Sequence, residues 1–511
     1  MKRSSGILLP ISSLPSKYGI GCFDRCAYDF VDQLMVSGQT YWQILPMGPT
    51  SFGDSPYQSF STFAGNPYFI SLKELVEKKY IKKSECEAAS KGTDDKKVCY
   101  DVLYEKRFSL LKKAFDNSNV MSDPGYEKFV EDNQDWLPDY ALFMAIKDSK
   151  NGISYLEWEE DIRLRQPEAM EKYKEKLSWE VNFYQFLQYE FHSQWKKLKN
   201  YANKSGIQII GDIPIYVAMD SADTWAHPEL FQLDEEGKPI GVAGCPPDAF
   251  SATGQLWGNP LYNWEAHKKS GYEWWIARIR KCYEWYDMVR IDHFRGFDEY
   301  YAIPYGDETA ENGQWEPGPG MELFDALKEE FEELPIIAED LGFLTDSVRE
   351  MLKESGFPGM KVLQFAFDSR DDSDYLPYHY EKNCVVYTGT HDNATTFSWW
   401  DELTKEDREF ALRYMNWSGM MNKKKMTWEM IRLAISSAAD LCIIPMQDYL
   451  CLPNTARMNV PSTIGGNWQW RMEKGAFDKA LTDKIWEMTK LYGRYKGKRR
   501  SNSLVQSDYI D

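Results

Sequence analysis

The sequence predicts an α/β fold: a (β/α)8 TIM barrel with helical and loop insertions on the C-terminal face and no C-terminal β-sandwich. Three observations support this prediction. Short apolar runs alternate with helix-like segments, several of these runs stop at acidic residues, and 511 residues are enough for one barrel with insertions. Continuous apolar strands between helices are typical of a parallel sheet that is covered on both faces.

Eight apolar runs bounded by turn residues are predicted to be the strands. They are residues 6–9, 41–45, 207–211, 288–291, 336–338, 362–365, 385–387 and 441–444. Helix-like segments precede most of them, at residues 24–36, 181–205, 273–286, 322–333, 344–355 and 427–439. This alternation favours a closed parallel barrel.

We interpret residues 1–511 as a single catalytic barrel unit. The gap between the second and third strands is too long for one crossover, so residues 70–200 are predicted to be a mainly helical insertion on the barrel mouth. Residues 213–287 form a second predicted insertion, which includes a loop rich in Gly and Pro near residues 241–248. The stretch after the eighth strand is too short for a separate β-sandwich.

Composition excludes several classes of function. A net charge of −19 argues against nucleic acid or an anionic membrane as a partner, and it permits a neutral substrate. Aromatic residues make up 15% of the chain, and their flat faces suit sugar rings. The nine cysteines include no CxxC pair, which indicates reduced thiols in a cytoplasmic protein. We expect no signal peptide and no membrane span, because no apolar run approaches ~18 residues.

No cofactor or metal is predicted. A phosphate-binding GxGxxG does not follow any predicted strand. The six histidines form no HxH or HExxH pattern, so a metal-dependent barrel hydrolase is a weak alternative.

Three carboxylates stand where apolar runs break off. The run at 288–291 ends at Asp292, the run at 334–338 ends at Glu339, and the run at 385–391 ends at Asp392. In a (β/α)8 barrel the ends of the strands share one mouth, so these side chains are predicted to meet there. Such a cluster is costly to build, and it indicates a reaction centre.

The surroundings of the carboxylates suggest different roles. Arg290 and Asp292 are two residues apart on a strand and point to the same face, so the guanidinium can hold the carboxylate ionised as a nucleophile. Glu339 follows an apolar run, where burial and neighbouring carboxylates would raise its pKa and favour a proton donor. Two such carboxyls are the apparatus for cleaving a glycosidic bond with retention. Asp392 and His391 would hydrogen-bond the sugar hydroxyls.

Each of these residues also has a purely structural reading. A lone Asp at a strand end is usually a turn or helix cap, and Asp212 and Asp448 taken singly have that status. Arg290 could be only an ion-pair partner, and His391 could be a core histidine with satisfied hydrogen bonds. The prediction of a reaction centre depends on several residues lying at the same end of one sheet.

Long motifs around these residues resemble the amylomaltase family of the α-amylase clan, the 4-α-glucanotransferases or disproportionating enzymes. The catalytic segments are Arg290-Ile-Asp-His-Phe-Arg-Gly296, Ile337-Ala-Glu-Asp-Leu-Gly342 and Gly389-Thr-His-Asp-Asn-Ala-Thr395. Further matches are the start at residues 3–21, Asp54-Ser-Pro-Tyr-Gln-Ser59, Ala64-Gly-Asn-Pro67, residues 246–260 and the end at 456–471. The resemblance covers nearly the whole chain.

The resemblance implies a role for each matching residue. Asp292 would be the nucleophile that forms a glycosyl-enzyme, Glu339 the acid and then the base, and Asp392 the transition-state stabiliser. The implied substrate-binding residues are Ser55, Tyr57, Asp212, Asp248, Phe250, Trp257, Arg290 and His391. Tyr57 would stack on the donor sugar, and Phe250 and Trp257 would flank the acceptor. The implied partners are α-1,4-glucans and glucose, and we expect a monomer.

The chain departs from the family pattern in its loops. Leu9 is followed directly by Pro10, without the family's usual His. Cys451 and Ser462 stand where Gly is more usual, and Ala249 stands where some members carry Tyr. These changes concern acceptor preference rather than the chemistry.

Two other functions compete with this prediction. A hydrolase of the same clan would release sugars to water, and a non-catalytic glucan-binding barrel would release nothing. The presence of all three acids argues against the non-catalytic protein, and the products formed from maltotriose separate the hydrolase from the transferase.

Overall fold

Eight parallel strands form the central sheet, and the computed structural model describes them within residues 2–247, 251–342 and 344–500. In the order of the sheet they are β10 (Gly359–Val362), β11 (Cys384–Tyr387), β12 (Leu441–Pro445), β1 (Ser4–Leu8), β2 (Tyr41–Gln43), β3 (Gln208–Pro214), β6 (Met288–Asp292) and β9 (Ile336–Ala338). The Ala338 amide donates to the Pro358 carbonyl at 3.0 Å, which brings the two end strands together. The sheet is therefore a nearly closed (β/α)8 barrel, as predicted.

The strands are apolar because both faces of the sheet are covered. Ile7, Val289, Ile337, Val386 and Ile443 come from five different strands, and each is completely buried. Their burial removes apolar surface from water on the inside of the barrel and beneath the surrounding helices. The core of the molecule is thus the barrel wall and its helical cover.

The sixth strand was predicted wrongly. The structure places it at Gly359–Val362, and residues Leu363–Phe365 form a short 3-10 helix instead. Gly359 and Lys361 are poor strand formers on their own. Pairing with β11 makes them a strand, in the register Gly359 to Cys384 and Val362 to Tyr387.

The six helices predicted next to strands all form. They are α1 (Arg25–Val36), α9 (Ser178–Lys204), α12 (Glu273–Trp285), α13 (Met321–Glu330), α14 (Asp346–Ser355) and α17 (Lys423–Ser436). Helix α19 (Lys479–Leu491), which was not predicted, also packs against α1 and α17. Their ends follow local rules: the Asp24 carboxylate accepts from the Cys26 amide at the start of α1, and Thr345 caps α14. Gly356 ends α14 with φ +74°, a conformation that glycine adopts without strain.

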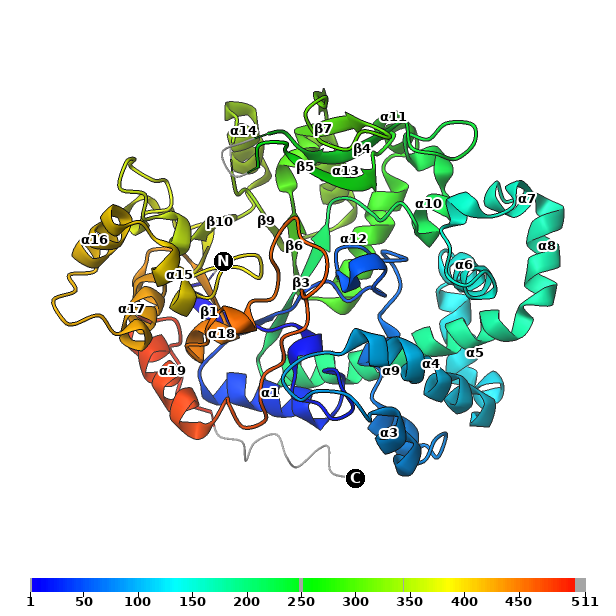
Figure 1. Cartoon of the computed structure of the whole chain (residues 1–511), viewed down its shortest axis with the longest axis horizontal. Helices are drawn as coiled ribbons and strands as arrows, with labels where there is room; N and C mark the ends of the chain where they lie inside the picture. The colour runs from blue at the N-terminus through cyan, green and yellow to red at the C-terminus, as the bar shows by residue number, and fades with distance from the viewer. Residues whose placement is uncertain (1, 248–250, 343, 501–511) are drawn as a thin grey trace.

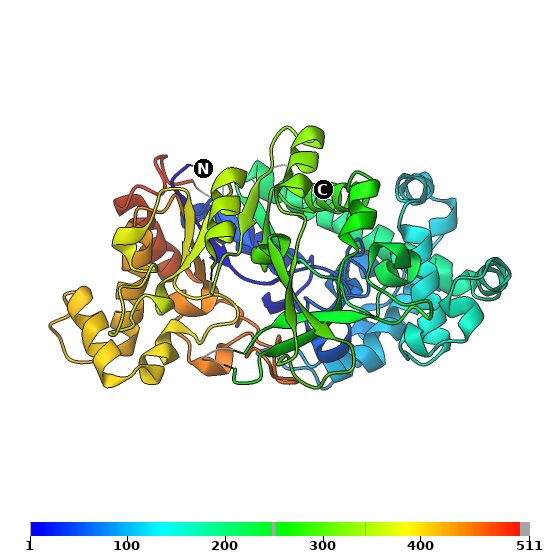
Figure 2. The same ribbon diagram turned by 90° about the horizontal axis from the view of Figure 1, so that it is seen from above.

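Helices fill the long stretch between β2 and β3. They are α2 (Leu72–Glu77), α3 (Lys83–Ala89), α4 (Tyr100–Asn117), α5 (Pro124–Asp132), α6 (Leu137–Ser149), α7 (Glu160–Arg163) and α8 (Pro167–Lys176). Helices α5 to α8 gather on one side of the barrel, opposite α15 (Thr396–Glu402), α16 (Lys405–Tyr414) and α17 (Figures 1 and 2). Helix α9 lies partly within the predicted 70–200 insertion, yet it also packs on β3 and α1 and connects the insertion to the barrel.

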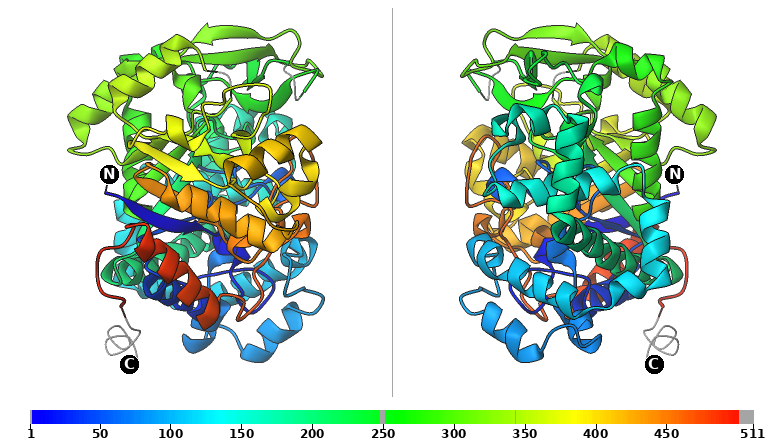
Figure 3. Two further views of the ribbon diagram at one scale, coloured as in Figure 1. Left: turned by 90° about the vertical axis from the view of Figure 1, so that its left-hand side faces the viewer. Right: turned by 90° about the vertical axis from the view of Figure 1, so that its right-hand side faces the viewer.

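A second, antiparallel sheet was not predicted. It has the order β5-β4-β7-β8 and consists of β4 (Gly241–Cys245), β5 (Gln255–Pro260), β7 (Glu299–Pro304) and β8 (Gln314–Pro317). Two of its strands follow β6, so it extends beyond the predicted 213–287 insertion. Figure 3 shows this sheet in green at the end of the molecule opposite α19. Its strands are short and partly polar, so their sequence pattern could not be told from that of the surrounding loops.

The remaining helices are α10 (Ala222–Ala226), α11 (Trp264–Lys269) and α18 (Met446–Tyr449). In the described part of the chain after β12, only helices and loops occur apart from one isolated bridge, so no C-terminal sandwich is seen up to residue 500. Among the described residues no helix combines the length and the apolar character that crossing a membrane requires.

Candidate active site

The barrel brings the predicted acidic residues to one end of its strands. Asp292 is the last residue of β6, and Glu339 follows β9 directly. The two strands pair at Ile291 and Ala338, so Asp292 and Glu339, the residues that come next, lie at the same level. Asp392 lies farther out: β11 ends at Tyr387, and Asp392 belongs to the loop that follows rather than to a strand end.

Arg290 joins two carboxylates. Its Nη1 donates to Asp212 Oδ1 at 2.8 Å and to Oδ2 at 2.9 Å, while its Nη2 donates to Asp292 Oδ1 at 2.8 Å. The Arg290 side chain is 4% exposed and that of Asp212 is fully buried. Burial raises the pKa of Asp212, and the Arg290 charge opposes that shift. The guanidinium therefore places a fixed positive charge beside Asp292.

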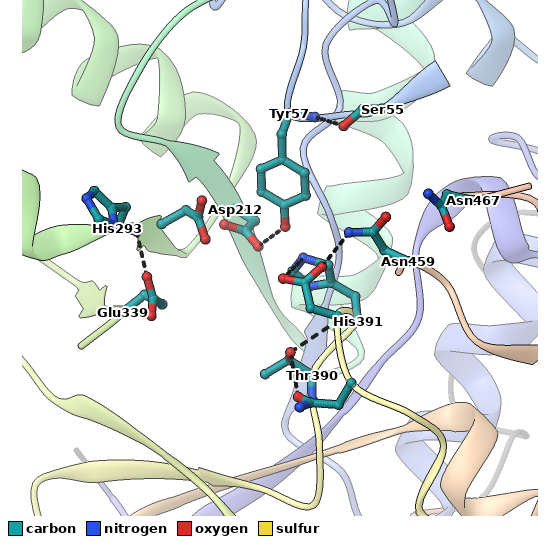
Figure 4. Close-up of polar contacts among 12 residues, drawn as sticks. Ser55, Tyr57, Asp212, His293, Glu339, Thr390, His391, Asn459 and Asn467 are labelled. Atoms are coloured by element: carbon teal, nitrogen blue, oxygen red, sulfur yellow. Dashed lines mark hydrogen bonds and ion pairs between the residues drawn. The ribbon is translucent and has the colours of Figure 1, made fainter. Parts of the chain in front are cut away.

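Tyr57 fixes the other side of Asp212. Its hydroxyl donates to Asp212 Oδ2 at 2.8 Å, and its ring stacks on His391 with centroids 5.2 Å apart (Figure 4). The backbone amide of Tyr57 donates to Ser55 Oγ at 3.3 Å. Ser55 thus supports the loop that carries Tyr57, and the tyrosine ring presents a rigid aromatic surface.

Glu339 is held by two backbone amides. The His293 amide donates to Oε2 at 2.7 Å (Figure 4). The Leu341 amide donates to Oε1 at 2.9 Å. Burial is the main cause that raises the pKa of Glu339 to about 7, and the Asp292 charge adds to it, against the opposing effect of Arg290. The direction agrees with the sequence prediction, and Glu339 carries a proton for much of the time at neutral pH.

Asp392 has the opposite character. Asn459 Nδ2 donates to its Oδ1 at 2.7 Å, and His391 Nε2 lies 3.3 Å from its Oδ2. Burial raises the pKa of Asp392, but His391 and Asn459 outweigh burial and bring it down to about 2. For His391 the two effects have the opposite signs. Burial lowers its pKa, and the Asp392 charge raises it by more, so the pKa of His391 is raised overall. Asp392 is thus an ionised carboxylate beside a polar histidine.

Trp257 lies on β5, in the second sheet, close to this centre. Its ring meets His293 edge to face at 4.8 Å and lies 6.3 Å from the Tyr216 ring. Burial lowers the pKa of His293 to about 4, so the imidazole is neutral at neutral pH. Trp257 therefore borders the same region as Glu339, whose carboxylate the His293 amide binds. Asp248 and Phe250, the other predicted acceptor-side residues, lie outside the described residues.

Several residues of the site were not assigned a role from the sequence. Arg457 Nη2 donates to the Asp392 carbonyl at 2.6 Å, and the Asn459 amide donates to the His391 carbonyl at 3.1 Å. The Trp468 ring lies 5.8 Å from both Tyr57 and His391. The only signal for Arg457, Asn459 and Trp468 was their place in a motif near the C-terminus, because their contacts join segments far apart in the chain.

The described residues contain no cluster of three or more His, Cys, Asp or Glu side chains that could hold a metal ion. The carboxylates of the site can supply acid–base and nucleophilic chemistry. An ionised carboxylate beside a protonated carboxyl can attack an acetal carbon while its leaving group takes a proton.

Comparisons with known proteins agree with this geometry. A family model described as 4-alpha-glucanotransferase matches residues 9–477. The chain is 51% identical to the 4-alpha-glucanotransferase of Clostridium butyricum, over 95% of this chain and 99% of that protein. It is 45% identical to that of Thermus thermophilus, over 93% of this chain and 96% of the relative.

Solved structures give the same result. The amylomaltase from Streptococcus agalactiae in complex with acarbose matches with a TM-score of 0.93 and 43% identity, over 97% of this chain and 100% of that one. The amylomaltase from Corynebacterium glutamicum shares the fold, with a TM-score of 0.76 and 18% identity, over 96% of this chain and 74% of the other. The sequence matches run through the segments that carry the acidic residues and Arg290, and this chain is an enzyme of the 4-alpha-glucanotransferase family.

Proposed function

We propose that the enzyme is a retaining 4-α-glucanotransferase. It moves α-1,4-glucan segments from a malto-oligosaccharide, starch or glycogen chain to the 4-OH of glucose or of another glucan. One observation carries the proposal. Asp292, held by Arg290, and Glu339, with its pKa raised to about 7, lie at the same level at the ends of adjacent strands. This arrangement supplies a nucleophile and an acid to one bond.

The reaction has two halves. In the first, an Asp292 oxygen attacks the anomeric carbon while the Glu339 proton passes to the leaving oxygen, which gives a covalent glycosyl-aspartate and a shortened glucan. In the second, Glu339 takes the proton from the acceptor 4-OH, and that oxygen displaces Asp292. Two inversions restore the α configuration, and the protonation state of Glu339 is returned to its starting point.

Asp392 and the residues around it stabilise the transition state. The sugar becomes cationic at its ring oxygen and anomeric carbon, and an ionised carboxylate nearby is favourable. Because the pKa of Asp392 is lowered to about 2, it keeps this charge at every working pH. His391 and Asn459 hold it in place and can hydrogen-bond sugar hydroxyls.

The substrate is a neutral glucan. The Tyr57 ring stands above Asp212, where it can stack on the donor sugar, and Trp257 borders the acceptor side. Asp248 and Phe250 are proposed to complete that side. The amylomaltase of Streptococcus agalactiae was solved with acarbose, which supports an oligosaccharide ligand here. We expect a cytoplasmic monomer that works without a cofactor.

Incubation with maltotriose tests this function. A transferase converts it into glucose and a ladder of longer malto-oligosaccharides, with minor hydrolysis. Formation of glucose and maltose alone would show a hydrolase and overturn the proposal, and no turnover at all would favour the non-catalytic barrel.

A further inference from the structure

Asp448 is a buried carboxylate that accepts three hydrogen bonds. It is 1% exposed, and it accepts from Thr388 Oγ1 at 2.6 Å, from Thr396 Oγ1 at 2.6 Å and from the Thr396 amide at 2.7 Å. In the parts of the chain that are described, its surroundings consist of these neutral donors, and no Lys, Arg or His side chain forms an ion pair with it. These three donors therefore supply the local stabilisation that offsets its burial.

The three donors lie at the two ends of one loop. Thr388 follows β11 directly, and Thr396 is the first residue of α15. His391 and Asp392 lie between them, on the loop of residues 388–396. A single carboxylate on α18, the helix that follows β12, therefore binds both ends of the segment that carries the proposed transition-state stabiliser.

Hydrogen bonds as well as packing hold this loop. A small cavity borders it, lined among others by Gly389, Thr390, Ala394, Asp448 and Arg457. Several polar contacts hold it. Asp448 binds its two ends, and Arg457 and Asn459 bind Asp392. Gln364 adds neutral contacts to Thr388, Ala394 and Thr396. Asp448 is thus the carboxylate among the groups that hold both ends of the loop.

We propose that Asp448 is a positioning residue for His391 and Asp392. Through its hydrogen bonds to Thr388 and Thr396 it fixes the position of the loop of residues 388–396 relative to the strands of the barrel. Asp448 touches neither substrate nor reacting atoms in this proposal, which rests on the proposed function of the same site. A loop displaced by even 1 Å would misplace Asp392 in the transition state, where rate is most sensitive to geometry. Binding of the glucan through the other parts of the site would change less.

Two variants separate hydrogen bonding from charge. Asp448→Ala leaves the loop ends without their acceptor and should lower kcat about 100-fold, with the donor KM nearly unchanged. Asp448→Asn keeps an acceptor for the Thr396 amide, and its NH2 can donate to the hydroxyls of Thr388 and Thr396, which accept as well as donate. We expect Asp448→Asn to retain kcat within about fivefold of the wild type.

Asp32→Ala is the matched control. Asp32 is also a buried carboxylate, 5% exposed, and it accepts from the Tyr201 hydroxyl at 2.7 Å between α1 and α9, outside the site. It should lower the thermal midpoint while kcat stays within about twofold of the wild type. Equal losses of kcat in Asp32→Ala and Asp448→Ala would show a general effect on the fold and overturn the positioning role.

A spectroscopic measurement gives a second, independent readout. In the wild type Asp392 raises the pKa of His391. In Asp448→Ala the two side chains should separate, and the His391 pKa, followed by NMR of labelled histidine, should fall. An unchanged His391 pKa together with wild-type kcat would overturn the proposal. If Asp448→Ala does not fold, Thr388→Val replaces it, since this variant removes one tie at similar volume and should lower kcat severalfold.

The maltotriose ladder of the wild type distinguishes this inference from the proposed function. A wild type without a ladder would remove the transferase proposal itself. A normal ladder in both the wild type and Asp448→Ala, at equal rates, would remove only the role of Asp448.

Discussion

Arg290 binds Asp212 and Asp292 at the same time, with Nη1 2.8 Å from Asp212 Oδ1 and Nη2 2.8 Å from Asp292 Oδ1. This planar fork connects β3 to the end of β6. Because Asp212 also accepts from Tyr57, the position of the donor-side aromatic ring is linked to that of the proposed nucleophile. Arginine suits this place better than lysine, because only a guanidinium offers several donors in one plane.

Arg290→Lys should therefore be strongly damaging. The ammonium keeps the charge but cannot bind both carboxylates in this geometry, and Asp212 would be left buried with poorer partners. We expect kcat/KM to fall at least about 100-fold and the thermal midpoint to drop. Arg370→Lys is the control, since Arg370 also binds a carboxylate, Asp368, through two nitrogens, but its side chain is 84% exposed. Similar losses in both variants would contradict the special role of Arg290.

The raised pKa of Glu339 predicts the alkaline limb of the pH profile. As an acid, Glu339 must carry its proton, so kcat/KM should fall as the pH rises through about 7. Glu339→Gln should lower activity on maltotriose by several orders of magnitude and remove this limb. With α-maltosyl fluoride, whose leaving group needs little protonation, the first half of the reaction should survive in Glu339→Gln. A retained alkaline limb near pH 7 in the variant would assign that limb to another group.

Trp257 should influence the competition between sugar and water. It borders the region of Glu339 through its contact with His293. Trp257→Ala would admit water and weaken acceptor positioning, so the fraction of hydrolysis should rise severalfold. The ratio of reducing ends to transfer products from maltotriose measures this. Trp179→Ala is the control, because Trp179 is an exposed tryptophan at the start of α9 and has no contact with His293 or Glu339 among those described. A ratio that Trp257→Ala leaves unchanged would exclude a role in acceptor positioning.

His267 should make the fold sensitive to acid. It is fully buried among Tyr262, Trp264 and Trp274, and burial lowers its pKa to about 4. The unfolded chain takes up this proton near pH 6.5, so the free energy of unfolding is highest above that pH and falls between pH 6.5 and 4. The shift corresponds to a contribution of about 3 kcal/mol across this window.

His267→Leu should flatten that pH dependence. Denaturant midpoints at pH 7.5, 6, 5 and 4 measure it, and the variant should lose less stability on acidification than the wild type. His192 and His293 are partly buried and also have lowered pKa values, so part of the slope remains. His379→Gln is the control, because His379 lies at the surface. An identical slope in His267→Leu and the wild type would contradict the prediction.

The apolar runs were enough to predict the barrel, because a strand buried on both faces must be apolar throughout. Seven of the eight predicted strands overlap those observed closely, and the sixth, predicted at 362–365, overlaps only at Val362. That strand contains Gly359 and Lys361, whose strand conformation comes from pairing with β11. The β7 and β8 strands were missed for a similar reason, since their short polar sequences gain strand structure only within the second sheet.

The acidic residues could be named from the chain alone, because each interrupts or closes an apolar run within a long motif. The roles of Asn459, Arg457 and Asp448, which hold the loop of Asp392, could not be assigned from the sequence. Asn459 and Arg457 bind Asp392 from 65 or more residues away, and Asp448 ties Thr388 to Thr396 across 60 and 52 residues. Local sequence patterns do not predict contacts between residues that far apart in the chain. The sequence thus determined which reactive groups the site contains. Their charge states and positions depend on burial and on partners distant in the chain, and only the folded barrel brings these about.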